Sequence, residues 1–402
     1  MIFLKGGNMR RLRQQAYPLD YSFLYILLAL FLFSVLTVYS GSGQYAASDP
    51  FYFAKRQVIW YAIGTGLLFA IAKMDYRLLQ KFVWPIYISG IALLMLVHLF
   101  GVSRNGSQRW LDLRLFEFQP SEFVKIGLIL FLAHVLVRHE KGDNSQRSQL
   151  MLTLKLGAAT AVPFYFILAQ PDLGSALVVV SAFFAVLMIS GVSLKLISAL
   201  LGLAAAFIGV LVFLHQYFFY VFSLFIKPHQ LDRIYGWLAP EQHASSLGYQ
   251  LIGAKQGIGS GQMFGSGFAQ GTQVQSGRIP EAHTDFIFSV IGEEFGFAGS
   301  AVLILLFLLL IYRIVLVAIR SDDLFGTYVA GGIAVLIAFQ VFQNIGMTIG
   351  LMPVTGLALP FISYGGSALL TNMMALGLVL SIQQRSNSVL AADAAWHSAR
   401  RA

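Results

Sequence analysis

Three titratable side chains stand close together in the run Pro280-Glu281-Ala282-His283-Thr284-Asp285. The run follows a glycine-rich stretch and precedes a very apolar one, so we expect it where the chain passes from water into lipid. Ionisable groups at such a boundary are costly and usually mark a functional site. Asp285 is the candidate catalytic carboxylate, because Glu281 and His283 supply the titratable neighbours that proton transfer needs. Taken alone, Asp285 fits equally well as a carboxylate that favours a helix N-terminus.

Glu122 and Lys125 form a second candidate group. They are three residues apart at the start of an apolar run, so one helical face carries both and they are close enough to pair. We favour a structural role, in which the pair holds two helices together. In the functional alternative, Lys125 contacts a substrate phosphate and Glu122 positions it.

Several arginines and lysines fall in polar segments where a membrane protein usually avoids them. Arg109 lies in one such segment, near Arg104 and Arg114, and a longer segment carries Arg233, Lys255 and Arg278. Solvated loop cations are the plain interpretation. The alternative is an anion site, and a pyrophosphate suits it, because arginine binds phosphate oxygens in a bidentate way.

Two further segments contain polar side chains beside proline and glycine. Asp172, in Gln170-Pro-Asp-Leu-Gly174, fits a helix cap slightly better than a substrate contact. Ser363 lies between Pro360 and Gly366, where non-helical backbone at membrane depth has to line a cavity or be buried in protein. We therefore include Asp172 and Ser363 among the substrate-binding candidates.

Other kinds of site are poorly supported. The histidines are scattered and cysteine is absent, so no zinc motif is present and we expect no protein metal site. The glycines between 257 and 267 follow no strand, so a nucleotide-binding loop is a weak interpretation. Those glycines are better explained by close backbone approach or by a turn that re-enters the membrane.

The composition indicates which elements must position these residues. Of 402 residues, 57% are hydrophobic and only 11% are charged, against about 25% charged in a soluble protein. We predict an all-α polytopic membrane protein. The net charge of +9 is spread over short loops between apolar runs, which suits cytoplasmic loops and anionic lipid better than nucleic acid.

About ten apolar stretches are long enough to be spans. They lie near 21–39, 57–72, 82–100, 121–137, 156–169, 173–189, 196–214, 286–312, 328–349 and 368–382. The second and fifth are short. We expect a basic cytoplasmic tail over 1–20, one membrane domain over 21–385 and a cytoplasmic tail over 386–402.

Basic residues follow every second span, which places those loops and both termini in the cytoplasm. The loops 101–120, 170–172, 215–284 and 350–367 then face outward, the third being the long loop between spans seven and eight. Every unusual motif falls in these outer segments, so we expect a single site at the outer membrane face.

Several motifs, in this order, resemble the shape, elongation, division and sporulation (SEDS) family of bacterial cell-wall polymerases. The resemblance covers roughly residues 20–385. The Gly271-Thr-Gln273 and Asn344-Ile-Gly-Met347 stretches look more like the rod-elongation (RodA-like) branch than the division (FtsW-like) branch. The motifs are Asn105-Gly-Ser-Gln-Arg-Trp110, Gln119-Pro-Ser-Glu-Phe-Val-Lys125, Gln170-Pro-Asp-Leu-Gly174, Gly248-Tyr-Gln250, Pro280-Glu-Ala-His-Thr-Asp-Phe286, Asn344-Ile-Gly-Met347 and Pro360-Phe-Ile-Ser-Tyr-Gly-Gly-Ser367.

The resemblance implies a ten-span enzyme of the bacterial cytoplasmic membrane that polymerises lipid II into β-1,4 glycan strands, with inversion and release of undecaprenyl pyrophosphate. It places the family's essential aspartate on Asp285 and its Glu/Lys pair on Glu122 and Lys125, and it adds Gln250 to the candidate site. It also implies a class B penicillin-binding protein, a transpeptidase, as partner. A divalent cation, Mg²⁺ or Mn²⁺, is a further candidate for stabilising the leaving pyrophosphate.

Two other functions remain open from the sequence. A lipid-linked-sugar flippase would also use many spans and intramembrane charges, although alternating access calls for polar features on both sides. A non-catalytic scaffold for a penicillin-binding protein would use small-residue helix faces instead.

Overall fold

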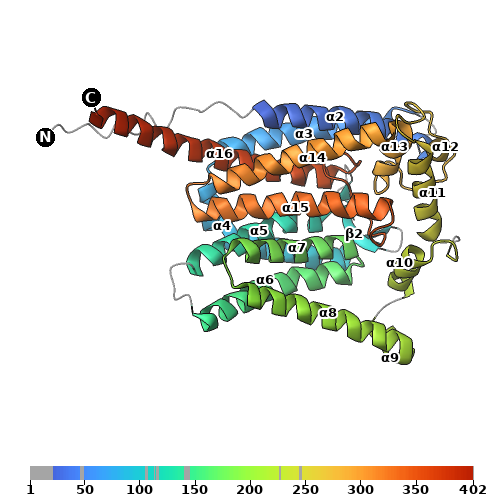
Figure 1. Cartoon of the computed structure of the whole chain (residues 1–402), viewed down its shortest axis with the longest axis horizontal. Coiled ribbons are helices and arrows are strands. Elements are labelled where there is room, and N and C mark those ends of the chain that lie inside the picture. Colours follow the sequence, from blue (N-terminus) through green and yellow to red (C-terminus); the bar gives the residue numbers. More distant parts are fainter. Residues whose placement is uncertain are drawn as a thin grey trace.

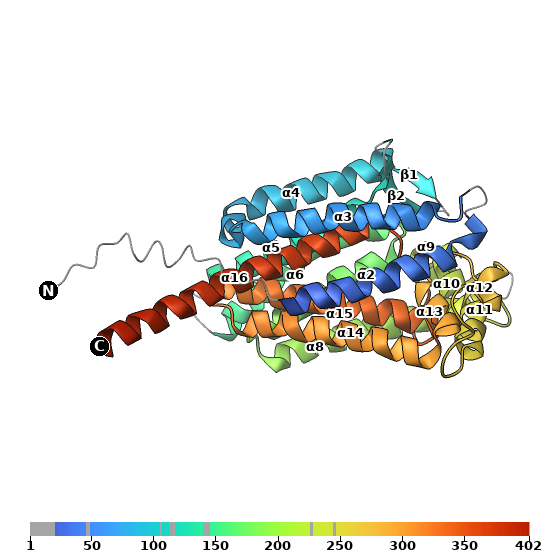
Figure 2. The ribbon, with the colours of Figure 1, turned by 90° about the horizontal axis from the view of Figure 1, so that it is seen from above.

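The computed structural model describes residues 21–45, 49–104, 107–112, 114, 117–139, 145–225, 228–243 and 247–401, with side chains up to Ser386. Ten long helices run roughly along one direction and form a bundle (Figures 1 and 2). They are α2 (Tyr21–Gly41), α3 (Tyr52–Lys73), α4 (Tyr76–Phe100), α5 (Pro120–His139), α6 (Gln146–Ala169), α7 (Leu173–Ile189), α8 (Leu194–Tyr217), α14 (Gly296–Ile319), α15 (Leu324–Thr348) and α16 (Gly366–Arg401).

The helix lengths confirm the expected fold class. Among the described residues, eight helices are long and apolar enough to cross a membrane. The other two long helices are α3, with 22 residues, and α7, an apolar helix of 17 residues, and they complete the expected set of about ten. The second and fifth stretches are longer than the sequence indicated, because α3 and α6 extend into more polar sequence at their N-terminal ends.

The eighth span differs from the expectation. In place of one helix over 286–312, the chain forms a short helix α13 (Ile287–Glu294), breaks at Phe295 and Gly296, and continues as α14. Gly296 has φ +65°, and a Cβ there would lie 2.3 Å from the backbone nitrogen of Gly265. Asp285 therefore precedes a short helix and not the long apolar one, because glycine allows a second segment to approach the break.

The loop over 101–120 contains strands that the sequence analysis did not anticipate. Strands β1 (Val102–Arg104), β2 (Ser107–Asp112) and β3 (Glu117–Phe118) pair in antiparallel order β1-β2-β3, with Val102 opposite Trp110 and Leu111 opposite Phe118. The sheet places Arg109 on the central strand. Residues 105 and 106 of the motif over 105–110 lie outside the described residues.

The long segment over 215–284 is also folded. It contains α9 (Phe219–Phe225), α10 (Pro228–Leu238), α11 (Leu247–Ser260) and α12 (Thr272–Gln275). A Cβ at Gly261 would lie 1.9 Å from the carbonyl oxygen of Gly292, and one at Gly265 would lie 2.1 Å from that of Glu294. Close backbone approach, one of the two alternatives, therefore explains these two glycines.

Glu293 and Glu294, on α13, are fully buried but need no basic partner. The Glu293 carboxylate accepts hydrogen bonds from the backbone N–H groups of Gln273 (2.7 Å) and Val274 (3.0 Å) at the start of α12, and Glu294 accepts one from the Ser40 hydroxyl. A carboxylate at a helix N-terminus is stabilised by just such donors. These acids thus attach the glycine-rich segment to the bundle.

Opposite ends of the bundle carry different structures. The sheet and α10–α13 lie at one end, and the final turns of α16 project beyond the other (Figure 1). α16 remains helical to Arg401, past the boundary at 385 where the sequence analysis placed the start of a tail. Helices α5, α15 and α16 are the most buried of the long helices, so packing in the core fixes the positions of the segments next to their ends.

Candidate functional site

Arg109 and Asp172 form a buried ion pair at the end of the bundle that carries the sheet. Arg109 comes from β2, and Asp172 caps α7 by accepting the backbone N–H of Ser175 at 3.0 Å. Arg109 Nη1 lies 3.5 Å from Asp172 Oδ1, and its other terminal nitrogen donates to Ser107 Oγ and to the carbonyl of Pro171. Arg109 Nε has no hydrogen-bond partner. The pair holds a guanidinium in place without using all its donors.

The Glu122–Lys125 pair is closer and similarly buried. Lys125 Nζ donates to Glu122 Oε1 at 2.7 Å, one turn apart on α5, and the lysine side chain is 1% exposed. Each charge has its counter-charge within hydrogen-bond distance. This geometry suits the structural role favoured from the sequence, because substrate would have to break the pair to reach Lys125.

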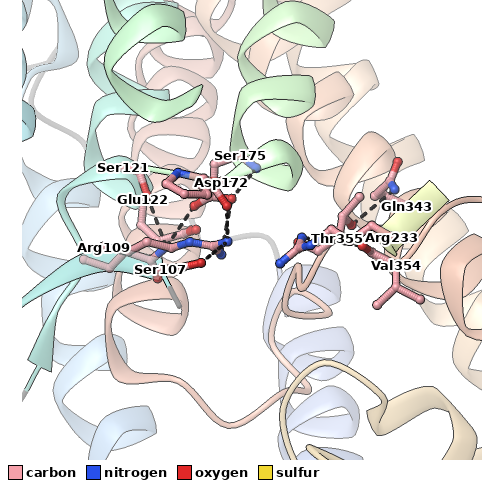
Figure 3. Close-up of polar contacts among 12 residues, drawn as sticks. Ser107, Arg109, Ser121, Glu122, Asp172, Ser175, Arg233, Gln343, Val354 and Thr355 are labelled. Carbon is pink, nitrogen blue, oxygen red and sulfur yellow. Dashed lines mark hydrogen bonds and ion pairs between the residues drawn. The ribbon is translucent and has the colours of Figure 1, made fainter. Parts of the chain in front are cut away.

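Arg233, on α10, faces the Arg109–Asp172 pair from the opposite side. Its Nη1 donates to the carbonyl of Thr355 at 3.1 Å. Figure 3 shows its guanidinium turned toward Arg109 and Asp172. Burial lowers the pKa of Arg233, and the nearby positive charge of Arg109 lowers it further. Two guanidinium groups from segments far apart in sequence thus share one polar region.

The turn that carries Asp285 is fixed through its backbone. Three successive carbonyls, those of residues 283, 284 and 285, accept hydrogen bonds from the Tyr364 N–H (2.9 Å), the Ser363 hydroxyl (2.6 Å) and the Asn344 amide (2.8 Å). Glu281, at φ +53°, starts the turn, and its N–H donates to the Tyr45 hydroxyl. The Asp285 carboxylate takes no part in these bonds, so its oxygens are left for other partners.

The electrostatic surroundings of Asp285 suit a base. Burial raises its pKa from 3.8 to about 6, the charge of Glu281 raises it too, and Arg109 and Arg233 counteract that rise. Asp285 nevertheless keeps part of its surface exposed. A general base works best when its pKa lies near the working pH while it stays accessible. Asp285 meets both conditions.

His283 and Glu281 occupy different surroundings within this turn. His283 is 5% exposed and lies between the rings of Phe53 (4.7 Å) and Tyr45 (4.8 Å). Burial lowers its pKa, so the imidazole is neutral at pH 7. Glu281 accepts a hydrogen bond from Thr284 Oγ1 at 2.8 Å. We therefore assign His283 the role of packing the turn, and Glu281 that of a negative charge near Asp285.

The remaining candidates lie on or near α11. Lys255 is exposed, and its Nζ is 3.8 Å from a Cβ built on Gly350, just after α15. Gln250, one turn earlier, is partly buried. Arg109, Asp172, Arg233, Glu281 and Asp285 thus interact electrostatically as one group, and Gln250 and Lys255 do not contribute to the pKa shifts of that group. Within the described residues, no three His, Asp or Glu side chains gather as a metal group.

Two further residues, Asn344 and Gly356, touch the site although their sequence context did not make them candidates. Gly356 has φ +71°, and a Cβ there would lie 3.1 Å from Asp285 Oδ2. Asn344 was quoted only for its motif, yet its amide binds the backbone of Asp285. A buried asparagine in an apolar helix was the available signal, because such a side chain needs hydrogen-bond partners.

Comparisons with known proteins identify the family of the chain. Residues 20–388 match the model of the family described as cell cycle protein, which covers FtsW, RodA and SpoVE. The chain is 38% identical over 366 residues to the peptidoglycan glycosyltransferase MrdB of Escherichia coli K12, covering 90% of this chain and 93% of the relative. It is 35% identical over 368 residues to the stage V sporulation protein E of Bacillus subtilis, covering 90% and 96%.

Solved structures give the same result. A chain in a peptidoglycan synthase complex that coordinates polymerization and crosslinking aligns with a TM-score of 0.74 and 31% identity, covering 92% of this chain and 98% of that one. The rod shape determining protein RodA of Thermus thermophilus aligns with a TM-score of 0.65 and 29% identity, covering 91% and 96%. On this evidence the chain is a multi-pass membrane protein of the FtsW, RodA and SpoVE family.

Proposed function

We propose that this chain, a peptidoglycan glycosyltransferase, polymerises lipid II with Asp285 as the general base. The observation that carries the proposal is Asp285, a partly exposed residue whose carboxyl has a pKa of about 6 and lies within the electrostatic influence of two guanidinium groups. A base and an anion site within one polar region are what a displacement with a pyrophosphate leaving group requires.

The reaction balances with these groups alone. Asp285 accepts the proton of the acceptor's GlcNAc 4-hydroxyl while that oxygen attacks the anomeric carbon of the donor MurNAc. The bond from that carbon to the pyrophosphate oxygen breaks, and undecaprenyl pyrophosphate leaves with the electron pair. One displacement inverts the centre and gives a β-1,4 link. The proton then passes from Asp285 to water.

Arg233 and Arg109 are the proposed anion-binding groups for the leaving pyrophosphate. Arg233 is only partly buried, and the charge of Arg109 acts on both Arg233 and Asp285. Lys255 is exposed on the neighbouring helix and would contact the distal part of the same anion. We place any divalent cation on the substrate's pyrophosphate, because no carboxylate group of three is present among the described residues.

Orientation and partner are part of the proposal. Basic residues follow every second span, which supports cytoplasmic termini in a bacterial cytoplasmic membrane and an outward-facing site. A class B penicillin-binding protein is the proposed partner, since a similar chain occurs in a complex that couples polymerization to crosslinking. The resemblance of 271–273 and 344–347 supports a role in rod elongation.

A reconstitution tests the function. The purified chain, with and without its cognate transpeptidase, is incubated with labelled lipid II, and glycan strands are resolved on a gel. We expect strands that persist when transpeptidation is blocked, and parallel reactions with Mg²⁺ or with EDTA show whether a divalent cation is needed. Movement of lipid II across vesicles without polymer would indicate a flippase instead. Polymer made only by the partner would indicate a scaffold.

A further inference from the structure

Asn344 lies in the penultimate turn of α15 and is fully buried. Its amide nitrogen donates two hydrogen bonds, one to the carbonyl of Asp285 at 2.8 Å and one to the carbonyl of Leu357 at 2.6 Å. An asparagine amide has two donor hydrogens, so both are used. The two acceptors are 59 and 13 residues away in the sequence, and they belong to different segments.

The two segments that Asn344 joins each hold one charge of the site in place. One is the turn with the Asp285 carboxylate. The other is the loop after α15, whose Thr355 carbonyl holds Arg233. Gly356 in that loop lies against the carboxylate, at 3.1 Å between its ideal Cβ and Asp285 Oδ2. The amide thus fixes the spacing between the base and one of its guanidinium groups.

The same loop also meets the Arg109 side of the site. A Cβ on Gly174, two residues after Asp172, would lie 2.6 Å from the Leu357 side chain. Leu357 is therefore wedged against the start of α7 while its carbonyl is held by Asn344. By holding Leu357, Asn344 links the turn that carries Asp285 to the segments next to both Arg109 and Arg233.

The turn has other supports that do not depend on this amide. Ser363 and Tyr364 hold the carbonyls of residues 284 and 283, so the turn keeps two of its three hydrogen bonds without Asn344. Loss of the amide leaves two carbonyls without this donor and frees the loop to shift. A displacement of about 1 Å at a reacting group reduces rate by about 10²-fold.

We propose that Asn344 is a positioning residue that sets the distance between Asp285 and Arg233 in the glycosyl transfer. The inference rests on the proposed function of Asp285. Asn344 itself does not touch substrate, and it acts through the backbone of Asp285 and Leu357.

The test compares Asn344→Ala with Thr348→Val. Thr348 is also fully buried on α15, and its hydroxyl bonds within the helix to the carbonyl of Asn344 at 2.7 Å, so its loss perturbs the same helix without contacting the turn. Initial rates of lipid II polymerisation are measured for the full chain with its transpeptidase, across substrate concentration and pH. Melting temperatures in detergent accompany each variant.

We expect Asn344→Ala to lower kcat by about 10- to 100-fold, with KM within about twofold of wild type. The acid limb of its pH profile should move to higher pH, because the arginines hold the base less closely. Thr348→Val should change neither. Asn344→Gln, which keeps the donor group, should recover part of kcat. Asn344→Asp keeps the side-chain volume and serves where the alanine variant does not fold.

An unshifted pH profile together with a rate loss that follows the melting temperature equally in both variants would overturn the inference. So would wild-type kcat in Asn344→Ala. The proposed function fails separately, since it requires Asp285→Asn to be inactive. Loss of activity in Asp285→Asn with full activity in Asn344→Ala would reject only the role of Asn344.

Discussion

Two buried ion pairs lie near the site, and they differ in how many of their polar atoms have a hydrogen-bond partner. Lys125 and Glu122 lie 2.7 Å apart, whereas Arg109 and Asp172, which are buried to a similar degree, lie 3.5 Å apart with one guanidinium nitrogen unpartnered. Asp285 responds to the charges of Arg109 and Asp172. We therefore expect the first pair to stabilise the helices, and we propose that the second keeps a positive charge available for an anion.

Breaking the Glu122–Lys125 pair should have the largest effect on stability. We expect Lys125→Met to lower the free energy of unfolding by about 3–5 kcal/mol, because it leaves the Glu122 carboxylate buried and alone. The double variant Glu122→Leu with Lys125→Met should return close to wild type, since apolar residues of similar volume replace a buried pair well. Thermal unfolding in detergent measures both. A stable double variant that makes no polymer would instead give the pair a catalytic role.

Breaking the Arg109–Asp172 pair should chiefly affect the reaction. Arg109→Gln removes a guanidinium that faces the proposed leaving group, and we expect polymerisation to fall by about 10²-fold. Asp172 keeps hydrogen bonds from Ser175 and Gln119, so the stability loss should be smaller than for Lys125→Met. Lys55→Gln is the control, because Lys55 pairs with Asp49 at the surface with 64% of its side chain exposed. Equal rate losses in Arg109→Gln and Lys55→Gln would remove Arg109 from the site.

The pH profile sharpens the same comparison. Asp285 acts as a base only when deprotonated, so the wild-type rate should fall as pH drops through about 6. Arg109 lowers the pKa of Asp285, so in Arg109→Gln the fall in rate at low pH should begin at a higher pH than in wild type. In Lys125→Met this fall should occur at the wild-type pH. Rates measured between pH 4.5 and 8 at saturating lipid II (a range of about 1.5 to 2 units around the pKa) check both.

The raised pKa also has a consequence for stability. A carboxyl with a higher pKa in the folded state, about 6 against 3.8, favours folding when protonated, and this contribution is lost as pH rises from 3.8 through 6. At pH 7 the ionised Asp285 thus costs up to ~3 kcal/mol. Asp285→Asn should therefore melt higher than wild type at pH 7, with the difference shrinking toward pH 4. An equal melting temperature at pH 7 would contradict the burial of this carboxylate.

The sequence predicted the elements better than it predicted the contacts between them. Apolar length alone located the long helices, since a span needs a continuous apolar run. The break at Gly296 was missed, because it depends on Gly265 approaching from 31 residues earlier in the chain. The short strands before α5 were missed as well. Two- to six-residue strands carry too little pattern to recognise.

The site was foreseeable in its charged residues and not in their supports. Asp285, Arg109 and Asp172 are conspicuous because charge is rare in an apolar chain. Asn344 and Gly356 are not, since their importance comes from partners that only the fold brings near. Lys125 shows the converse. Its charge attracted attention, but burial beside Glu122 leaves it little access to substrate.

The most direct test of the account is the rate of lipid II polymerisation by purified Asp285→Asn, measured with the cognate transpeptidase at pH 7.5 against wild type. The isosteric amide keeps the size of the side chain and cannot accept the proton, so we predict a folded protein whose rate falls by about 10²–10⁴-fold. Glycan synthesis within about twofold of wild type by a folded Asp285→Asn protein would show that this carboxylate is not the base.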